Sequence, residues 1–241
     1  MKTSLQNKVH LFYAPNASSG IFQLDAEESK HCLRVLRLKE GSCIFLTDGK
    51  GGFYTCVIHD ISEKVCNVEF IDKQEGYHKR NYRIHIAVAP TKNTDRLEWF
   101  AEKAVEMGID EITPLICDHS ERIIFKPERI RKIMVSAMKQ SLQAYLPVIH
   151  PAIQASEFIQ KEHSYHKYIA YLDEENNRPL KEIYLKGSDA LILIGPEGDF
   201  SEEEICQAKE HNFASINLGK TRLRTETAAM AACHTINLLN E

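Results

Sequence analysis

The chain has 241 residues, of which 43% are hydrophobic and 27% are charged, and its formal net charge is −4. This composition is typical of a globular protein with one large or two ordinary domains, and it argues against wholesale disorder. The small negative charge excludes a protein covered in positive potential. No apolar run approaches the roughly 20 residues of a membrane-spanning helix. Because the first residues also lack the apolar core of a secretory signal, we expect a cytoplasmic protein.

The seven cysteines are scattered along the chain, and no two of them form a CxxC pair. A zinc site usually shows closely spaced ligands, and a disulfide scaffold is typical of short secreted chains. We therefore expect reduced, mostly buried thiols. A lone HxxH pair, His163 and His166, has no evident third ligand, so no metal site is predicted.

Residues 9–72 predict a small β-rich unit. Short runs rich in β-branched and aromatic residues alternate there with turn residues such as Asp48-Gly49 and Gly51-Gly52. This spacing is typical of a small barrel or meander. The polar run that follows predicts a linker at 73–81, which divides the chain into domains at 1–72 and 82–241.

One helix is expected to interrupt the β-rich unit at residues 26–38. His31, Arg34 and Arg37 lie three residues apart, so a helix would place them on one stripe. Such a stripe could contact successive phosphates of a nucleic acid, or it could be an ordinary solvated face.

The second domain begins with a predicted βαβ unit, formed by a strand at 82–90, a helix and a strand at 110–116. Asp95 and Glu98 form an Asp variant of the capping box, and Gly108 is in the usual place for the helix end. Such units build parallel sheets. The loop after the first strand carries Lys92 and Arg96, which places two cations at the carboxyl edge of the sheet.

After a long helix from Pro127 and a strand at 168–172, two strand–loop–helix passages follow within forty residues. The first has a strand at 191–194, a Gly-Pro-Glu-Gly turn and a helix capped by Ser201 and Glu204. The second has a strand at 216–218, a basic loop and a helix with Thr225 as its expected N-cap. Ligands of parallel α/β proteins bind at the carboxyl ends of the strands, so the two loops predict a ligand site.

The loop composition narrows the ligand class. Gly195 and Gly198 flank Pro196 and Glu197, and a backbone with so few side chains can approach a nucleoside-like ligand closely. Neither the dinucleotide fingerprint GxGxxG nor the phosphate-binding GxxxxGK[ST] is present. Glu226 lies in the first turn of the last helix, where an acidic residue is also favourable for the helix dipole alone.

Two motifs, GPEGDFS at 195–201 and LGKTRLRTETA at 218–228, resemble those of the RsmE family of 16S rRNA uridine-N3 methyltransferases, in the SPOUT class. HLFYAP, HCLRVLRLKEG and LEWFAEKAVEMGIDEITPL follow the order of that family, so the resemblance covers nearly the whole chain. It implies an α/β protein with an N-terminal PUA-like β-barrel and a C-terminal SPOUT domain. That domain is expected to contain a deep trefoil knot, which the sequence pattern alone would not predict because knots are nearly absent from proteins.

The resemblance also implies S-adenosyl-L-methionine as cofactor, 16S rRNA of the small ribosomal subunit as partner and a homodimer. The residues that it assigns to the cofactor are Tyr171, Leu172, Gly195, Pro196, Glu197, Gly198, Leu218, Gly219, Leu223 and Arg224. The candidates for contact with the RNA are His31, Arg34, Arg37, Lys92 and Arg96. The chain departs from the family at Asp199, Thr221, Lys139, Leu142 and Gln143, where relatives often have Gly, Arg, Glu, Gly and Arg.

The implied reaction transfers a methyl group to N3 of a uracil, which must lose its proton. Arg224 is the candidate for stabilising negative charge on the uracil oxygens, and Glu226 or Glu197 for accepting the proton. Two alternatives stay open: a SPOUT enzyme with another target, such as a ribose 2′-OH or a tRNA guanine, and a non-catalytic RNA-binding protein with the same fold.

Overall fold

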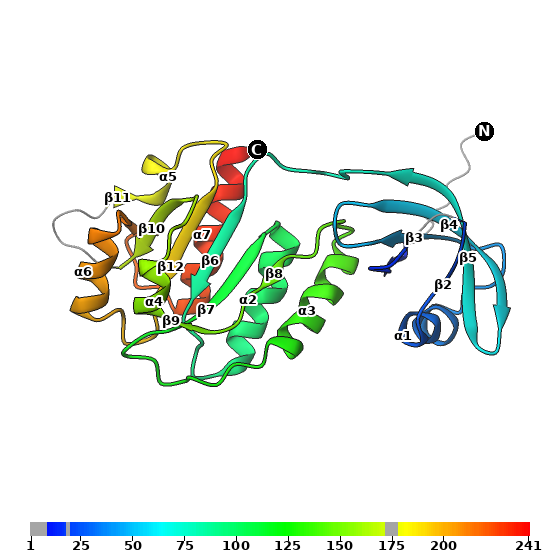
Figure 1. The fold of residues 1–241 in the computed structure, drawn as a ribbon, viewed down its shortest axis with the longest axis horizontal. Helices are drawn as coiled ribbons and strands as arrows, with labels where there is room; N and C mark the ends of the chain where they lie inside the picture. Colours follow the sequence, from blue (N-terminus) through cyan, green and yellow to red (C-terminus); the bar gives the residue numbers. More distant parts are fainter. Residues whose placement is uncertain (1–8, 18–19, 172–177) are drawn as a thin grey trace. The chain divides into compact units, whose positions relative to one another are not determined.

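The computed structural model describes residues 9–17, 20–171 and 178–241 (Figure 1). The chain forms two compact units, Met1–Lys79 with Met138–Leu146 and Arg80–Ala137 with Pro147–Glu241. The predicted limits at 1–72 and 82–241 placed residues 138–146 in the second domain, and the structure instead assigns them to the first unit. Sequence reasoning missed this because a segment that returns to an earlier unit carries no pattern of its own.

The first unit is built on a five-stranded sheet with the strand order β1-β3-β4-β5-β2, which confirms the predicted β-rich unit. β1 pairs with β3 in parallel, and the other pairings are antiparallel. Its core contains Phe12, Leu24, Ile44, Leu46, Ile58 and Val68. The strands are Leu11–Tyr13 (β1), Ile21–Gln23 (β2), Cys43–Thr47 (β3), Phe53–Ser62 (β4) and Val65–Gln74 (β5).

The predicted helix at 26–38 is shorter and changes its pitch. It consists of an α-helix, Ala26–Lys30 (α1), followed by a π-helical turn, His31–Val35 (η1). Arg37 lies beyond this turn with a φ of 55°, so the predicted stripe of three cationic side chains is wrong. In a π-turn the backbone bonds span five residues, as from Leu36 N to His31 O, and a three-residue spacing no longer stacks side chains.

Residues 138–146 are held to the first unit by polar and apolar contacts. Thr47 donates a buried hydrogen bond from Oγ1 to the carbonyl oxygen of Ala144. Ala144 also packs in a small cluster with Leu11 and Phe53. Leu142 joins this cluster although its φ is 57°, a left-handed conformation that costs a residue other than glycine about 1–2 kcal/mol. A glycine, which relatives often have at this position, would adopt this conformation without strain. In Leu142 the apolar packing offsets the strain.

The cation of Lys139 lies against a buried carboxylate of the same unit. Lys139 Nζ is 2.6 Å from Glu28 Oε1, and the Glu28 side chain is only 8% exposed. The backbone amide of Tyr13 donates to the same oxygen. Lys139, one of the departures from the family pattern, thus has a structural role that the sequence did not reveal.

Replacing Lys139 with methionine is expected to destabilise the first unit by about 3 kcal/mol, because it leaves the buried Glu28 carboxylate without its cation. The double substitution Lys139→Met with Glu28→Gln should recover most of this loss. Lys73→Met is the matched control, since Lys73 forms an equally short ion pair with Glu75 at the surface. Chemical denaturation followed by circular dichroism measures the effect, and equal losses for Lys139→Met and Lys73→Met would contradict it.

The second unit is a parallel α/β domain with the strand order β11-β13-β10-β12-β6-β7-β8, and β9 pairs with β7. The two central strands, β6 and β12, are buried at every residue, as expected when helices cover both faces of a sheet. The strands are Ile84–Val88 (β6), Glu111–Ile116 (β7), Val148–Ile149 (β8), Ile153–Gln154 (β9), His166–Ala170 (β10), Arg178–Pro179 (β11), Ala190–Ile194 (β12) and Ala214–Asn217 (β13).

The described residues of this unit form six helices, the second of which ends with three residues of the first unit. They are Thr94–Met107 (α2), Pro127–Gln140 (α3), Ala155–Gln160 (α4), Leu180–Ile183 (α5), Glu202–Glu210 (α6) and Thr225–Asn240 (α7). α7 packs against α2, β6 and β12, and α4 packs against α6 (Figure 1). Leu191 and Leu193 of β12 pack in the core cluster that includes residues of α4. Side chains of a strand point alternately to the two faces of the sheet, so the residues between them face the opposite layer.

The helix ends partly match the predicted caps. Asn93 caps α2 by accepting a hydrogen bond from the amide of Asp95, so the prediction of Asp95 as the N-cap is wrong. The backbone is already helical from Thr94, and two candidate caps two residues apart cannot be told apart by pattern. Gly108 ends α2 with a left-handed φ of 94°, as predicted. The capping box of Ser201 and Glu204 at α6 is also confirmed.

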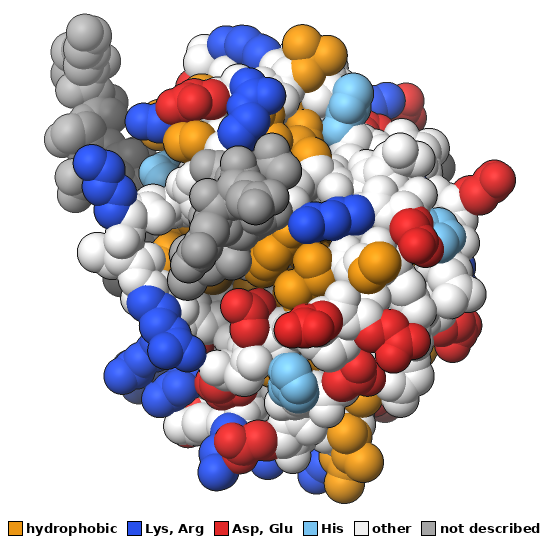
Figure 2. Space-filling view, turned by 90° about the vertical axis from the view of Figure 1, so that its left-hand side faces the viewer, with side chains coloured by type: hydrophobic (Ala, Val, Ile, Leu, Met, Phe, Trp, Pro, Cys, Tyr) orange, Lys and Arg blue, Asp and Glu red, His pale blue; other side chains and the backbone are white. Residues whose placement is uncertain are grey.

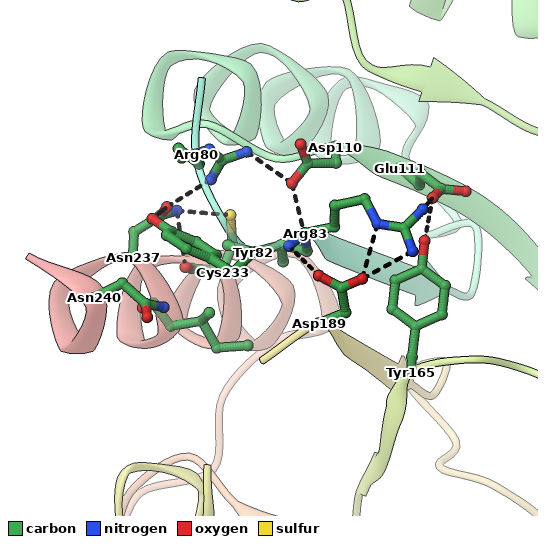
Figure 3. A network of polar contacts seen from close by, with 12 residues as sticks. Arg80, Tyr82, Arg83, Asp110, Glu111, Tyr165, Asp189, Cys233, Asn237 and Asn240 are labelled. Carbon is green, nitrogen blue, oxygen red and sulfur yellow. Dashed lines mark hydrogen bonds and ion pairs between the residues drawn. The ribbon is translucent and has the colours of Figure 1, made fainter. Parts of the chain in front are cut away.

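A polar network fixes the beginning of the second unit to its last helix (Figure 3). Arg80 donates to Asp110 Oδ2 at 2.7 Å and to Asn237 Oδ1 at 2.9 Å. Tyr82 donates to the same Asn237 oxygen at 2.8 Å. Burial raises the pKa of the Asp110 carboxyl, and the opposing effect of Arg80 favours its charged form. The entry into β6 and the end of α7 therefore share one set of hydrogen bonds.

Among the residues that the structure describes, no helix has the length and apolar character needed to cross a membrane.

Candidate active site

A cavity of about 430 Å³ lies at the carboxyl ends of β10, β12 and β13. Its walls are the loop after β12, the loop after β13 and the first residues of α7. The cavity lies at the edge of the sheet where the two strand–loop–helix passages predicted a ligand site. The volume falls in the range of sites that hold small molecules and cofactors.

Most residues assigned to the cofactor by resemblance line this cavity. They are Tyr171, Gly195, Pro196, Glu197, Leu218, Gly219, Leu223 and Arg224. Leu172 lies outside the described residues. Gly198 is not among the lining residues, and its carbonyl oxygen instead accepts from His119 Nδ1 at 3.2 Å when that nitrogen carries the proton. A Cβ at Gly198 would stand 3.0 Å from the His119 Cβ, so this glycine allows close packing of two loops.

Further lining residues were not assigned to the cofactor from the sequence. They are Ala170, Ile194, Asp199, Ile216, Asn217, Thr221, Arg222, Thr225 and Ala228, together with Arg96. Several are the last residues of buried strands, so the rule that ligands bind at carboxyl strand ends was the signal that could have found them. Arg96 was predicted for RNA contact, and the structure places it in the cavity wall.

The hydroxyl of Thr225, which was predicted to cap a helix, joins the two loops. Thr225 Oγ1 donates a buried hydrogen bond of 3.0 Å to the carbonyl oxygen of Gly195. The N-cap of α7 is Arg224, which makes no side-chain cap bond, so the prediction of Thr225 as the N-cap is wrong. The acceptor of this hydroxyl lies in another loop, so the sequence around Thr225 could not indicate it. A Cβ at Gly195 would stand 3.1 Å from ring carbons of Phe200, so a side chain there would require Phe200 to shift.

Replacing Thr225 with valine is expected to lower the free energy of unfolding by about 1–3 kcal/mol, because the buried Gly195 carbonyl loses its donor. It should also weaken ligand binding in the cavity, since the loops are no longer joined. Thr227→Val is the matched control, because Thr227 is exposed in the same helix turn. Urea denaturation checks the stability and calorimetric titration checks the binding. Equal behaviour of the two variants would show that the loops are held by other contacts.

Asp199, another departure from the family pattern, has a backbone explanation. Its φ is 64°, in the left-handed region, where glycine is unstrained and aspartate is tolerated better than most residues. Its Oδ1 accepts from the amide of Phe200 at 2.9 Å, a local bond that stabilises this turn. Asp199 therefore keeps the loop geometry that glycine would give. Gly219 in the second loop has a φ of 135°, which a side chain would strain.

Two oppositely charged side chains lie close together beside the cavity. Arg96 Nε lies 3.8 Å from Glu226 Oε1, and the Glu226 side chain is 10% exposed. Glu226 Oε2 is buried and has no hydrogen-bond partner among those residues, an arrangement that usually costs free energy and calls for a functional explanation. Glu226 itself is not among the lining residues, whereas Arg224 and Arg222 are.

The remaining candidates for RNA contact lie on exposed surfaces. His31, Arg34 and Arg37 are exposed in the first unit. Lys92 in the second unit is exposed and pairs with Glu121 at 2.7 Å. Figure 2 shows acidic side chains gathered on one face of the second unit, and α6 contributes the exposed Glu202, Glu203 and Glu210. This part of the surface would repel the phosphates of a nucleic acid.

Comparison with known families gives two matches that together cover most of the chain. A model described as an RNA methyltransferase domain matches residues 78–237. A model described as an RNA methyltransferase PUA domain matches residues 24–71. The N-terminal unit is thus PUA-like, and the parallel-sheet unit is a methyltransferase domain.

Individual relatives agree with these matches. The chain is 30% identical over 227 residues to the ribosomal RNA small subunit methyltransferase E of Rickettsia conorii, covering 92% of each chain. A probable rRNA-methyltransferase from Porphyromonas gingivalis is similar in structure, with a TM-score of 0.89, 42% identity and coverage of 96% and 98%. A ribosomal RNA small subunit methyltransferase E from Neisseria gonorrhoeae, bound to S-adenosyl methionine, has a TM-score of 0.85, 30% identity and the same coverage.

The two domain matches, the relatives that cover nearly the whole chain and the cavity at the predicted sheet edge agree. The chain belongs to the RsmE family of ribosomal RNA small subunit methyltransferases.

Proposed function

We propose that the protein transfers a methyl group from S-adenosyl-L-methionine to N3 of one uridine in the 16S rRNA of the small ribosomal subunit. The observation that carries this proposal is the cavity of about 430 Å³ between the two glycine-containing loops, in a chain of the RsmE family. The relative from Neisseria gonorrhoeae is bound to S-adenosyl methionine, which supports the same cofactor here.

The residues present fit such a cofactor. Gly195, which packs closely against Phe200, and Gly219, with its positive φ, present backbone without side chains at these two positions of the loops. Their peptide groups, with Leu218 and Tyr171, would hold the nucleoside part of the cofactor. The bound cofactor supplies an electrophilic methyl group, and the protein aligns the acceptor with it.

The protein's own side chains would manage charge at the acceptor. Arg224 lies in the cavity wall, and its guanidinium would stabilise negative charge on the uracil oxygens as N3 loses its proton. Glu226 is our candidate for accepting that proton, directly or through water, because one of its buried oxygens has no partner in the described residues. Glu197, which lines the cavity, is the second candidate. N3 lies on the pairing edge of the base, so the uridine must be unpaired or turned out of its helix.

The PUA-like unit would bind the RNA backbone through His31, Arg34 and Arg37, and Lys92 and Arg96 would do so beside the cavity. We further propose a deep trefoil knot and a homodimer in the methyltransferase domain. The topology supports the knot: β13 lies beyond β10 in the sheet, whereas the following α7 packs back on β6 and β12. The chain must therefore return past the loop after β12. As its substrate is ribosomal, the protein would act in the cytoplasm.

The purified protein, S-adenosyl-L-methionine and small subunits from a strain that lacks the gene provide the test. Mass spectrometry of the digested rRNA should find 3-methyluridine at one position, and free 16S rRNA tested in parallel shows which form is the substrate. A methylated ribose, or methylguanosine in tRNA, would indicate a SPOUT enzyme with another target. Absence of both methylation and cofactor binding in calorimetry would indicate a non-catalytic RNA-binding protein.

A further inference from the structure

Three potential metal ligands meet at the amino edge of the methyltransferase sheet, opposite the cavity. His85 is in β6, Glu111 begins β7, and His150 follows β8. One donor atom of each residue lies within 4.8 Å of the others. His150 Nε2 is 2.8 Å and His85 Nδ1 is 3.9 Å from Glu111 Oε2. From this geometry we propose that His85, Glu111 and His150 bind one Zn²⁺ ion.

The donor set fits zinc better than the hard cations. Two imidazole nitrogens and one carboxylate oxygen, with a water as fourth ligand, form a known tetrahedral zinc arrangement. Calcium and magnesium prefer oxygen ligands only. Zinc bonds of about 2.0–2.2 Å require ligand atoms roughly 3.4 Å apart. The distances of 2.8 Å and 3.9 Å lie on either side of that value, so small shifts of the Glu111 and His150 side chains would complete the site.

His85 and Glu111 are each oriented by a second hydrogen bond. His85 Nε2 lies 2.7 Å from Thr113 Oγ1, and with the proton on Nε2 the free lone pair is on Nδ1, which faces Glu111. Tyr165 donates from its hydroxyl to Glu111 Oε1, which leaves Oε2 toward the two histidines. Hydrogen bonds of this kind fix the tautomer and the carboxylate direction of metal ligands.

The surrounding charges permit a cation at this position. Arg83 Nη1 is 3.9 Å from Glu111 Oε1, but the Arg83 guanidinium is itself paired with Asp189 at 2.8 Å (Figure 3). The charges of Arg83 and Asp189 therefore cancel, and the carboxylate of Glu111 adds one negative charge. The His85 side chain is 6% exposed, whereas that of His150 is 37% exposed. An ion could enter from the His150 side, as a usable site requires.

The position of this site indicates a structural role. Its ligands join β6, β7 and the residue after β8 at the end of the sheet that lies away from the cavity. Bound zinc should therefore stabilise the second unit and leave methyl transfer unchanged. The proposal does not depend on the proposed function, and its test needs no methylation assay.

The direct measurement is zinc titration of the full chain after treatment with a chelator. One Zn²⁺ per chain is expected. Zinc at about 100 times the dissociation constant should raise the unfolding midpoint by about 5–10 °C. His150→Gln, which retains a hydrogen-bonding side chain at an accessible position, should lower the affinity by about 100-fold and reduce the shift to about 1 °C. Tyr165→Phe, which removes only the orienting bond, should lower it by about 10- to 100-fold.

The controls separate this site from other ligands. His59→Gln is the matched variant, because His59 forms a similar pair with Glu69 but has no third ligand in the described residues. The double variant Cys43→Ser with Cys206→Ser removes the exposed thiols, which would compete for zinc. Both should bind zinc like the unaltered protein. Crystals soaked in zinc should show an anomalous peak between His85, Glu111 and His150. Stoichiometric binding that survives His150→Gln, or no binding by the unaltered protein, would overturn the proposal.

Discussion

Replacing Arg224 with alanine is expected to lower the kcat of methyl transfer by about 100- to 1,000-fold, the usual effect of removing one donor that stabilises developing charge. Arg224 lies at the start of α7 and lines the cavity, so its guanidinium can reach an acceptor base held there. The apparent affinity for the cofactor should change less than kcat, because in the proposed complex the backbone of the two loops makes most of the cofactor contacts. Steady-state kinetics with small subunits as substrate separates the two effects.

Two further variants define the role of Arg224. Lys220→Ala removes a cation from the same loop at a position that does not line the cavity, and its kcat should stay near that of the unaltered protein. Arg224→Lys keeps the charge but loses the planar fork, so an intermediate kcat is expected if hydrogen-bond geometry matters. An unchanged kcat in Arg224→Ala would remove this residue from the mechanism. Equal losses in Arg224→Ala and Lys220→Ala would instead indicate general attraction of RNA.

Replacing Glu226 with glutamine is expected to lower kcat by at least about 100-fold, as for the loss of a general base. The substitution keeps the size of the side chain and removes its ability to accept a full proton. Because Glu226 Oε2 is buried without a partner in the described residues, the fold should tolerate the change, and the unfolding midpoint should fall little or not at all. Kinetics and thermal denaturation of the same preparation measure both.

The pH profile of kcat distinguishes a base from a residue that only holds Arg96. If Glu226 accepts the proton, the loss of rate in Glu226→Gln should become smaller at high pH, where the N3 proton of uracil leaves without a base. If its only task is the contact with Arg96 at 3.8 Å, the rate should fall at every pH and the profile should keep its form. Glu197→Gln is the comparison, since Glu197 lines the cavity. A larger loss in Glu197→Gln than in Glu226→Gln would transfer the role of base to Glu197.

Local patterns predicted many elements of this protein correctly. The buried strands, the capping box of Ser201 and Glu204 and the Gly108 helix end all depend on residues close in sequence. The errors occurred where a group finds a distant partner. Thr225 was assigned to a helix cap because its actual acceptor, the Gly195 carbonyl, is 30 residues away. Arg37 was placed on a helical stripe because a π-turn has no distinctive spacing in the sequence.

The sequence by itself determined the fold class, the two glycine-containing loops at the carboxyl edge of the sheet and the resemblance that led to the RsmE family. These follow from hydrophobic periodicity and turn residues, which act over a few positions. Only the tertiary structure decided that residues 138–146 belong to the first unit, that Lys139 neutralises the buried Glu28, and that His85, Glu111 and His150 lie together. Such contacts arise when distant segments pack together. A buried polar group without a partner costs free energy, so it pairs with a group that is near in space, however far away in sequence.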